Sequence, residues 1–399
     1  MAIYEGRTGE YTTFGSIKCF KPKALPPNPP IDLTGKLSVV LSAADRALAR
    51  LDGAALTLPD PDLFVYAFMR QEAVLSSQIE GTQASLEDLF EFEAAAQNTS
   101  TESDIVEVIN YLNAMSWALG EISTRPITLN LIKETHQILL RQGRGAGRAP
   151  GEFRKSQNWI GPPGCTIDEA SFVPPAVPLM EQALSEFENF IHETNDLPPL
   201  IRCGLIHAQF ETIHPFWDGN GRLGRMLVTL LLCSEEILSK PILYLSLFFK
   251  SHKQEYYERL QATRDHGQLE QWLEFFLRGI TVTSKSALQS AQRISALRES
   301  IHAGLPSTSR SVKAPTLLDA LFRHPYITVP QAAEQIGSTY PTANSMISDF
   351  VAGKILEEIT GAQRDRIFAF RPYLDVLHNS IDDLTGVLDG EDYLVSQGR

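Results

Sequence analysis

The sequence predicts a mainly α-helical protein with one β-hairpin inserted near its middle and a winged helix-turn-helix domain near its C-terminus. Two observations predict this fold class. Apolar residues recur at three- and four-residue spacings through most of the chain before residue 303, as they do on amphipathic helices. Beyond a Gly-, Pro-, Ser- and Thr-rich linker at 303–314, the pattern predicts three short helices and a hairpin, which together make a winged helix.

Proline and glycine clusters divide the 399 residues into five regions. Residues 1–32 are a turn-rich N-terminal arm that ends in LPPNPP, a segment that proline keeps extended or irregular. Helices are expected over 33–120, a helical core over 121–300, the winged helix over 310–372 and an acidic tail over 373–399.

The central hairpin and the C-terminal elements follow from local signals. Trp159 to Pro175 reads as two short strands around a Pro-Pro-Gly turn, with prolines that mark a free edge. Thr328 and Gln331 form a capping box at a helix start, and the next helix should stop at Gly353 in a left-handed cap. Two strands at 355–359 and 367–370 would form the wing.

Composition restricts the kind of protein. The chain has 48 acidic and 35 basic residues and a formal charge of -13, which argues against a general polyanion binder. Its four cysteines lie far apart, as reduced thiols of a cytosolic protein do. No apolar run is long enough for a membrane span and the N-terminus does not resemble a signal peptide, so we expect a soluble cytoplasmic protein without a membrane partner.

The winged helix gives only weak support for DNA as a partner. Its predicted recognition helix, 339–352, contains no Lys or Arg, and Arg310–Arg371 holds seven basic and six acidic residues. The wing cluster Arg364, Asp365 and Arg366 keeps duplex binding open, and a protein-interaction or dimerisation role is at least as well supported. The sequence leaves open whether the chain forms a homodimer.

The segment HPFWDGNGRLGR, His214 to Arg225, carries the candidate chemistry. A helix that ends at Pro215, a turn with two glycines and a new helix near Asn220 bring backbone N–H groups and a positive helix end together, which suits a pyrophosphate. The arginines can clamp phosphate oxygens, Asp218 can hold a divalent cation, and His214 can accept a hydroxyl proton. The alternative is a structural turn with a core histidine, but so many convergent groups within twelve residues disfavour it.

HPFWDGNGRLGR matches His-x-Phe-x-Asp-Gly-Asn-Gly-Arg-x-x-Arg in full and resembles the signature of the Fic family of protein adenylyltransferases. The likeness covers most of the chain: 159–175 looks like the family's flap, 33–89 its N-terminal helices and 244–277 the helices after the motif. It implies a Fic helical core that transfers AMP from ATP to a Ser, Thr or Tyr hydroxyl of a target protein or of the chain itself.

The resemblance also implies residue roles. His214 would be the general base, Phe216 would anchor the loop in the core, and Asp218 would hold Mg2+ on the phosphates of ATP. A target segment would add as a strand to the flap. The implied nucleotide-binding positions are Glu80, Asn158, Trp159, Ile160, Gly161, Asp218, Gly219, Asn220, Gly221, Arg222, Leu223, Gly224, Arg225 and Tyr257; for Tyr257, a core position is the alternative to stacking on adenine.

Ser76-Ser77-Gln78-Ile79-Glu80-Gly81 looks like the family's inhibitory helix motif. Beside an intact signature, it predicts that Glu80 pairs with Arg225 and so competes with the γ-phosphate, which makes the enzyme inactive by default. Two rivals stay open within enzymes, transfer of another phosphate-containing group and hydrolytic removal of AMP. A third rival is a winged-helix DNA-binding regulator whose core senses nucleotide.

Overall fold

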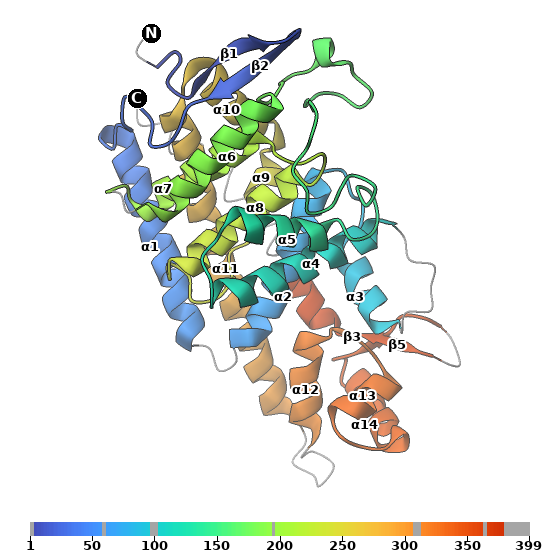
Figure 1. Ribbon diagram of the computed structural model, residues 1–399. Helices are drawn as coiled ribbons and strands as arrows, with labels where there is room; N and C mark the ends of the chain where they lie inside the picture. Colours follow the sequence, from blue (N-terminus) through green and yellow to red (C-terminus); the bar gives the residue numbers. More distant parts are fainter. Residues whose placement is uncertain are drawn as a thin grey trace.

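The computed structural model describes residues 4–57, 61–95, 103–193, 196–305, 313–361 and 365–378, and they are mainly helical, as predicted (Figure 1). The helices up to residue 304 are α1 (Gly35–Thr57), α2 (Pro61–Ile79), α3 (Leu86–Ala94), α4 (Ser103–Ile122), α5 (Leu129–Leu139), α6 (Val177–His192), α7 (Pro199–Ile213), α8 (Asn220–Ser234), α9 (Ser246–Ser251), α10 (Lys253–His266) and α11 (Leu269–Gly304).

The helix α7 forms the centre of the larger part of the molecule. Between Leu200 and Ile213 every residue except Arg202 is buried, as expected for a helix that is covered on all sides. Its neighbours α6, α8, α10 and α11 supply the cover. The end of α7 and the start of α8 are therefore held in a rigid surround, and the motif loop 214–219 lies between them.

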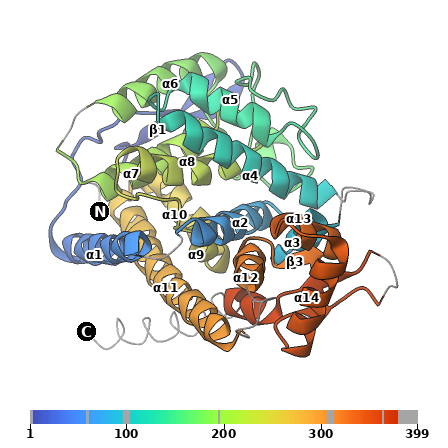
Figure 2. The same cartoon turned by 90° about the horizontal axis from the view of Figure 1, so that it is seen from below.

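The helix α2 lies between this core and the C-terminal elements, in contact with α4, α8, α9 and α12 (Figure 2). Its middle is fixed by Glu72, which is 2% exposed and accepts bonds from Ser246 N at 3.0 Å, from the Ser246 hydroxyl at 2.5 Å and from Tyr111 Oη at 3.3 Å. Its C-terminal end, followed by Glu80 and Gly81, points at the start of α8.

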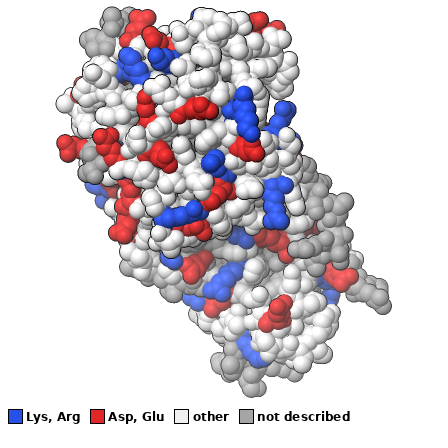
Figure 3. Space-filling view, viewed as in Figure 1, with Lys and Arg blue, Asp and Glu red and all other residues white. Residues whose placement is uncertain are grey.

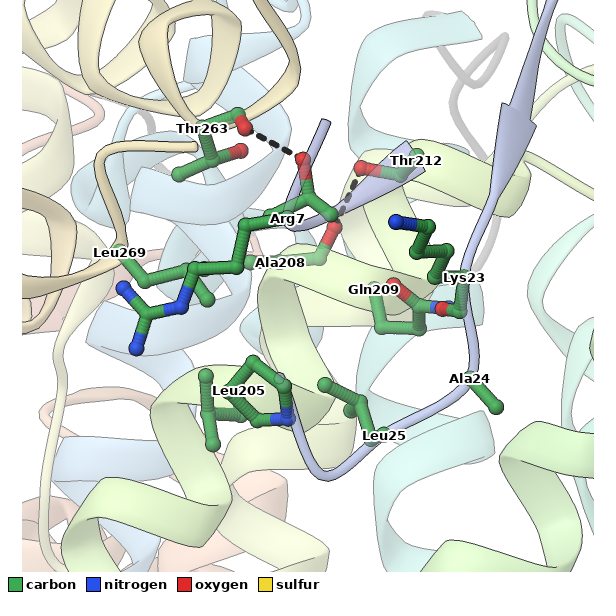
Figure 4. A pocket seen from close by; sticks show the side chains of 12 residues that line it. Arg7, Lys23, Ala24, Leu25, Leu205, Ala208, Gln209, Thr212, Thr263 and Leu269 are labelled. Atoms are coloured by element: carbon green, nitrogen blue, oxygen red, sulfur yellow. Dashed lines mark hydrogen bonds between the residues drawn. The ribbon is translucent and has the colours of Figure 1, made fainter. Parts of the chain in front are cut away.

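The N-terminal arm differs from the irregular segment that the sequence predicts. Gly9–Phe14 (β1) and Ile17–Pro22 (β2) form an antiparallel hairpin, and the described residues before and after it are irregular. Alternating Tyr, Thr, Phe and Ile around Gly15-Ser16 was an available strand signal. The arm wraps onto the core: Thr8 Oγ1 donates to Thr263 O at 2.6 Å, and Figure 4 shows Arg7, Lys23 and Gln209 around a small pocket beneath it.

The predicted flap hairpin is shorter than expected. Ile160 and Phe172 form one antiparallel bridge, with N···O distances of 2.8 and 3.1 Å, and 3-10 helix η1 (Ile167–Glu169) occupies the connection. The prolines that flank the bridge have no N–H to donate, so the ladder cannot lengthen. Phe20 N donates to Val173 O at 2.9 Å, which places β2 beside the flap.

The C-terminal elements are α12 (Ala314–Arg323), β3 (Tyr326–Thr328), α13 (Val329–Gln335), α14 (Tyr340–Ala352), β4 (Glu357–Glu358) and β5 (Ile367–Ala369). The strands form one antiparallel sheet in the order β3-β5-β4, and the Thr328 capping box is present. These helices and strands lie near the predicted places, and β3 was not predicted. The winged-helix assignment stays a prediction.

Two C-terminal details correct the sequence analysis. Gly353 has a φ of -78° and is not a left-handed cap; Lys354, with a φ of 56°, takes that conformation. Residues 371–378 are helical, and Tyr373 and Leu377 are buried, so the predicted tail does not begin at 373. The rest of the tail, most of the linker, and Arg364 lie outside the described residues.

Basic and acidic side chains are interspersed on the face that Figure 3 shows, without a large area of one sign. No helix among the described residues is both long and apolar enough to cross a bilayer.

Candidate active site

The motif loop is built from a reversal between α7 and α8. His214 ends α7 in the left-handed conformation, with φ 48° and ψ 60°, and Gly219 precedes α8 with φ 78°, where glycine is favoured. Phe216 is fully buried between them, as predicted. The Asn220 side chain closes the loop: Oδ1 accepts from Phe216 N and Nδ2 donates to Phe216 O, each at 2.9 Å. That side chain therefore braces the loop, and the place of Asn220 on the phosphate path stays a prediction.

His136 on α5, which the sequence analysis missed, supports the same loop. Its ring stacks on Phe216 with centroids 3.7 Å apart. Gly151 N donates to Nδ1 at 2.9 Å, so Nε2 carries the proton and donates to Asp218 O at 3.0 Å. Burial lowers the pKa of His136 to about 4, so the ring is uncharged and supports the loop through its stacking and hydrogen bonds.

The candidate base, His214, is held neutral. Its side chain is 19% exposed, and burial lowers its pKa to about 3, with further lowering by the charges of Arg264 and Arg154. Its carbonyl accepts from Arg154 Nε at 3.1 Å and from Asn158 Nδ2 at 3.2 Å, which fixes the backbone. A neutral imidazole has a free lone pair to accept a proton.

Glu80 and Arg225 form the ion pair that the sequence predicted. Arg225 Nη2 donates to Glu80 Oε1 at 2.7 Å and to Ser76 O at 2.9 Å, and Nε donates to Ser76 Oγ at 2.9 Å. Glu80 Oε1 would be only 2.3 Å from a Cβ at Gly221, so the carboxylate lies directly on the first turn of α8. Burial alone would raise the pKa of Glu80, but the charges of Arg225 and then Arg222 lower it overall.

Arg222 has a different partner. Nη1 donates to Glu107 Oε2 at 3.1 Å, and both side chains are 3% exposed or less. Glu107, on α4, also accepts from Arg144 Nε at 2.6 Å, and Arg144 donates to Thr82 Oγ1 at 3.0 Å. The sequence analysis did not identify Glu107 or Arg144.

Asp218 lies at the open side of the loop. Its side chain is 40% exposed, Oδ1 accepts from Gly219 N at 2.6 Å, and Arg222 Nη2 is 3.5 Å away. Among the residues that the structure describes, no cluster of three or more His, Cys, Asp or Glu could hold a metal ion by itself.

The predicted flap and aromatic residues differ in exposure: one is buried and two are partly exposed. Asn158 is 6% exposed and its amide is bound to the motif-loop carbonyls, including Phe216 O at 2.9 Å, so it holds the loop. Trp159 is 42% exposed and donates to Cys165 O, beside the Ile160 bridge and Gly161. Tyr257 is 44% exposed, and the charges of Glu80 and Arg225 act on it, which places it near that pair.

Two predicted positions on α8 face the protein interior. Leu223 is 2% exposed and its N–H already donates to Gly219 O at 3.0 Å. A Cβ at Gly224 would meet Glu211 Oε1 at 2.5 Å, so this glycine makes room for a carboxylate of α7. Glu211 was also missed, although its position three residues before His214 on one helix is a readable signal.

Comparison with known proteins agrees with this geometry. The Fic/DOC family N-terminal region matches residues 39–120, and the Fic/DOC family domain matches residues 126–232, which include the whole motif. The chain carries a Fic/DOC family domain. The family resemblance and the mainly helical fold predicted from the sequence are therefore confirmed.

Curated relatives of this Fic chain are named protein adenylyltransferases. That of Drosophila grimshawi is 32% identical over 31% of this chain and 23% of its own, and that of Aedes aegypti 29% identical over 37% and 27%. A probable protein adenylyltransferase of Aquifex aeolicus is 23% identical over 44% and 51%. The chain thus spans between a quarter and a half of these relatives.

Solved structures support the fold. A Fic family protein from Desulfovibrio desulfuricans G20 aligns with a TM-score of 0.55 at 18% identity, over 86% of this chain and 97% of its own. A Fic domain-containing signalling protein from Bacteroides thetaiotaomicron aligns with a TM-score of 0.50 at 18% identity, over 63% and 97%.

Proposed function

We propose that this protein transfers AMP from ATP to Ser, Thr or Tyr hydroxyls of target proteins, itself among them, and that Glu80 inhibits it. The observation that carries the proposal is the joint position of three features: a neutral His214, a helix start built on glycine, and Arg225, which donates to the Glu80 carboxylate and to the Ser76 hydroxyl. The names of the curated relatives support the same activity.

The proposed reaction is an in-line displacement. The target hydroxyl oxygen bonds to the α-phosphorus, the bond from that phosphorus to diphosphate breaks, and the hydroxyl proton passes to the free nitrogen of His214. The N–H groups at the start of α8 and the guanidinium groups of Arg222 and Arg225 neutralise phosphate charge.

Asp218 is the residue that fits a magnesium ion. Its carboxylate is partly exposed at the loop, and Mg2+ commonly binds proteins through one or two carboxylates while ATP phosphates and water supply the other ligands. The ion would neutralise developing charge on the phosphates.

Inhibition would arise from competition for one position. Glu80 occupies both Arg225 and the surface over Gly221, where a phosphate would have to lie. An anion bound there requires the end of α2 to move away. The carboxylate itself, rather than the whole helix, is the competing group.

The flap offers an asymmetric edge to a target segment. Val173 O on its second strand already accepts from Phe20 N of β2, so the side of Trp159 to Gly161 is the one on which a target strand would add. The DNA-binding alternative has no described basic residue on α14 in its favour.

Incubation with ATP labelled at the α- or γ-phosphate tests the proposal in wild type, Glu80→Gly and His214→Ala. We expect the α label alone on protein, more strongly in Glu80→Gly, and none in His214→Ala. Transfer of the γ label indicates a kinase-like reaction, and loss of label from AMP-modified protein indicates removal of AMP. If Glu80→Gly transfers neither label while duplex DNA binds tightly, a regulator is the better description.

A further inference from the structure

Glu211 is a buried carboxylate to which the proposed reaction gives no role. It lies on α7, three residues before His214, and its side chain is 8% exposed. Its Oε2 atom is 3.9 Å from His214 Nδ1. Within the described residues, neither Glu211 Oε1 nor His214 Nδ1 has a hydrogen-bond partner of ordinary geometry, although the backbone of Glu211 lies close enough to the ring to raise the pKa of His214. The 3.9 Å between Oε2 and Nδ1 is too long for a hydrogen bond, so the two side chains would have to approach one another to form one. A buried carboxylate and a buried ring nitrogen that both lack partners are costly, so their nearness needs a reason.

The surrounding chain is shaped to keep this carboxylate in place. Gly224 leaves the space that Oε1 fills, since a Cβ there would approach to 2.5 Å. Arg264 Nη2 donates to the backbone oxygen of Glu211 at 3.1 Å and leaves the carboxylate free. Charged groups that act on the pair are Arg225, Arg264, Arg154 and Glu80.

We propose that Glu211 is a positioning residue for His214: its carboxylate accepts the proton on Nδ1, which leaves Nε2 free to take the hydroxyl proton, and its charge stabilises the imidazolium that then forms. An acceptor-only group behind a general base fixes its tautomer, as in other base-orienting pairs. The inference rests on the proposed function for the identity of the reaction but not for the pairing itself.

The position of Glu80 links this pair to inhibition. Burial raises the pKa of Glu211 to about 7; Arg225 opposes that rise and the negative charge of Glu80 adds to it. When Glu80 leaves, the pKa of Glu211 therefore falls, and more of the carboxylate is ionised near pH 7. The same movement that frees Arg225 thus favours the form of Glu211 that can hold His214.

The test uses the full chain with 15N-labelled histidine in a Glu80→Gly background, with His214→Ala to assign the resonance. Long-range imidazole spectra report the tautomer directly. We expect the Nδ1–H tautomer in the parent and a mixture in Glu211→Gln, whose amide can present either oxygen or NH2. In Glu211→Gln the amide oxygen could still accept the Nδ1 proton and keep the parental tautomer. Glu211→Met has no comparable acceptor and removes that ambiguity. Glu181→Gln, at an exposed position of α6, is the control.

Kinetics of AMP transfer add a second readout. We expect kcat to fall about 10- to 100-fold in both Glu211 variants, the range for outer partners of a functional histidine, with KM for ATP unchanged. Retention of the parental tautomer in both variants overturns the proposal, whatever the rate. If the tautomer responds to Glu211 but the parent transfers no AMP, the proposed function fails and the positioning role stands.

Discussion

Arg222 and Arg225 lie three residues apart on α8, yet they pair with carboxylates from two different segments of the chain. Glu107 comes from the second turn of α4, is 2% exposed and is shared with Arg144. Glu80 comes from the turn after α2, and its side chain is 35% exposed. Arg222 is thus held by a carboxylate inside the core. Arg225 is held by Glu80, which lies just after the end of a helix and can move away.

The difference suggests how a single motif combines fixed and removable parts. A buried carboxylate within a helix can be displaced only by disrupting the core, whereas a turn after a helix opens locally at small cost. The helix α2 itself shows both behaviours, because Glu72 fixes its middle and Glu80 lies at its free end. Regulation by the end of α2 leaves the rest of the site assembled.

Substitution of Glu107 should give the largest effect on stability. Glu107→Ala leaves Arg222 buried without its carboxylate, and breaking a buried ion pair typically costs about 3–5 kcal/mol. Glu80→Ala removes a partly exposed partner and should cost about 1 kcal/mol or less. Urea unfolding of the two variants measures the contrast. Equal losses in the two would show that the pairs do not differ as their burial implies.

Substitution of Glu80, which should affect stability little, should have a large effect on the affinity for ATP. Glu80→Gly frees Arg225 for phosphate, and a hydrogen bond to a charged group is worth about 1.5–3 kcal/mol, so ATP should bind about 10- to 150-fold more tightly. Titration calorimetry with His214→Ala in both backgrounds measures binding without turnover. An unchanged Kd would mean that Glu80 does not compete with the nucleotide.

Glu72, which fixes the middle of α2, should make the free energy of unfolding depend on pH. Burial raises the pKa of Glu72 from 4.5 to about 7, although bonds from Ser246 oppose the rise. Because the folded pKa lies above the unfolded one, this contribution to stability is complete below pH 4.5 and is lost as the pH rises through 7, at most by about 1.4 kcal/mol per pH unit. As the pH rises from 4.5 to 7, the free energy of unfolding should fall more in the wild type than in Glu72→Gln. Parallel pH profiles would contradict the assignment.

What the sequence could predict depends on distance along the chain. The motif loop is contiguous, so its turn, its helix start and the buried Phe216 follow from local spacing. Glu80 is 145 residues from Arg225, and only the resemblance of its segment to a family motif connected them. Glu107 is 115 residues from Arg222 and lies in no comparable motif, so no sequence pattern indicated that pair.

Packing decided the remaining differences. The strands β1 and β2 had a visible alternating pattern, but the proline-rich segment after them favoured an irregular arm. Asn158 and Asn220 are predicted to line the nucleotide path, and the sequence did not indicate that both amides also hold backbone carbonyls of the loop. A polar side chain's partner depends on which backbone groups the fold leaves unpaired, and residue type alone does not give that.

Arg144 offers the finest test of the fixed pair, because it touches Glu107 from the solvent side. Its side chain is 51% exposed, so Arg144→Ala should cost about 0.2–1 kcal/mol, as exposed ion pairs do, and the cost should shrink in high salt. The Glu107–Arg222 bond is buried and should persist without it. Lys155→Ala, which removes another exposed ion pair, is the matched control. A loss as large as that of Glu107→Ala would mean that Arg144, rather than burial, keeps Glu107 on Arg222.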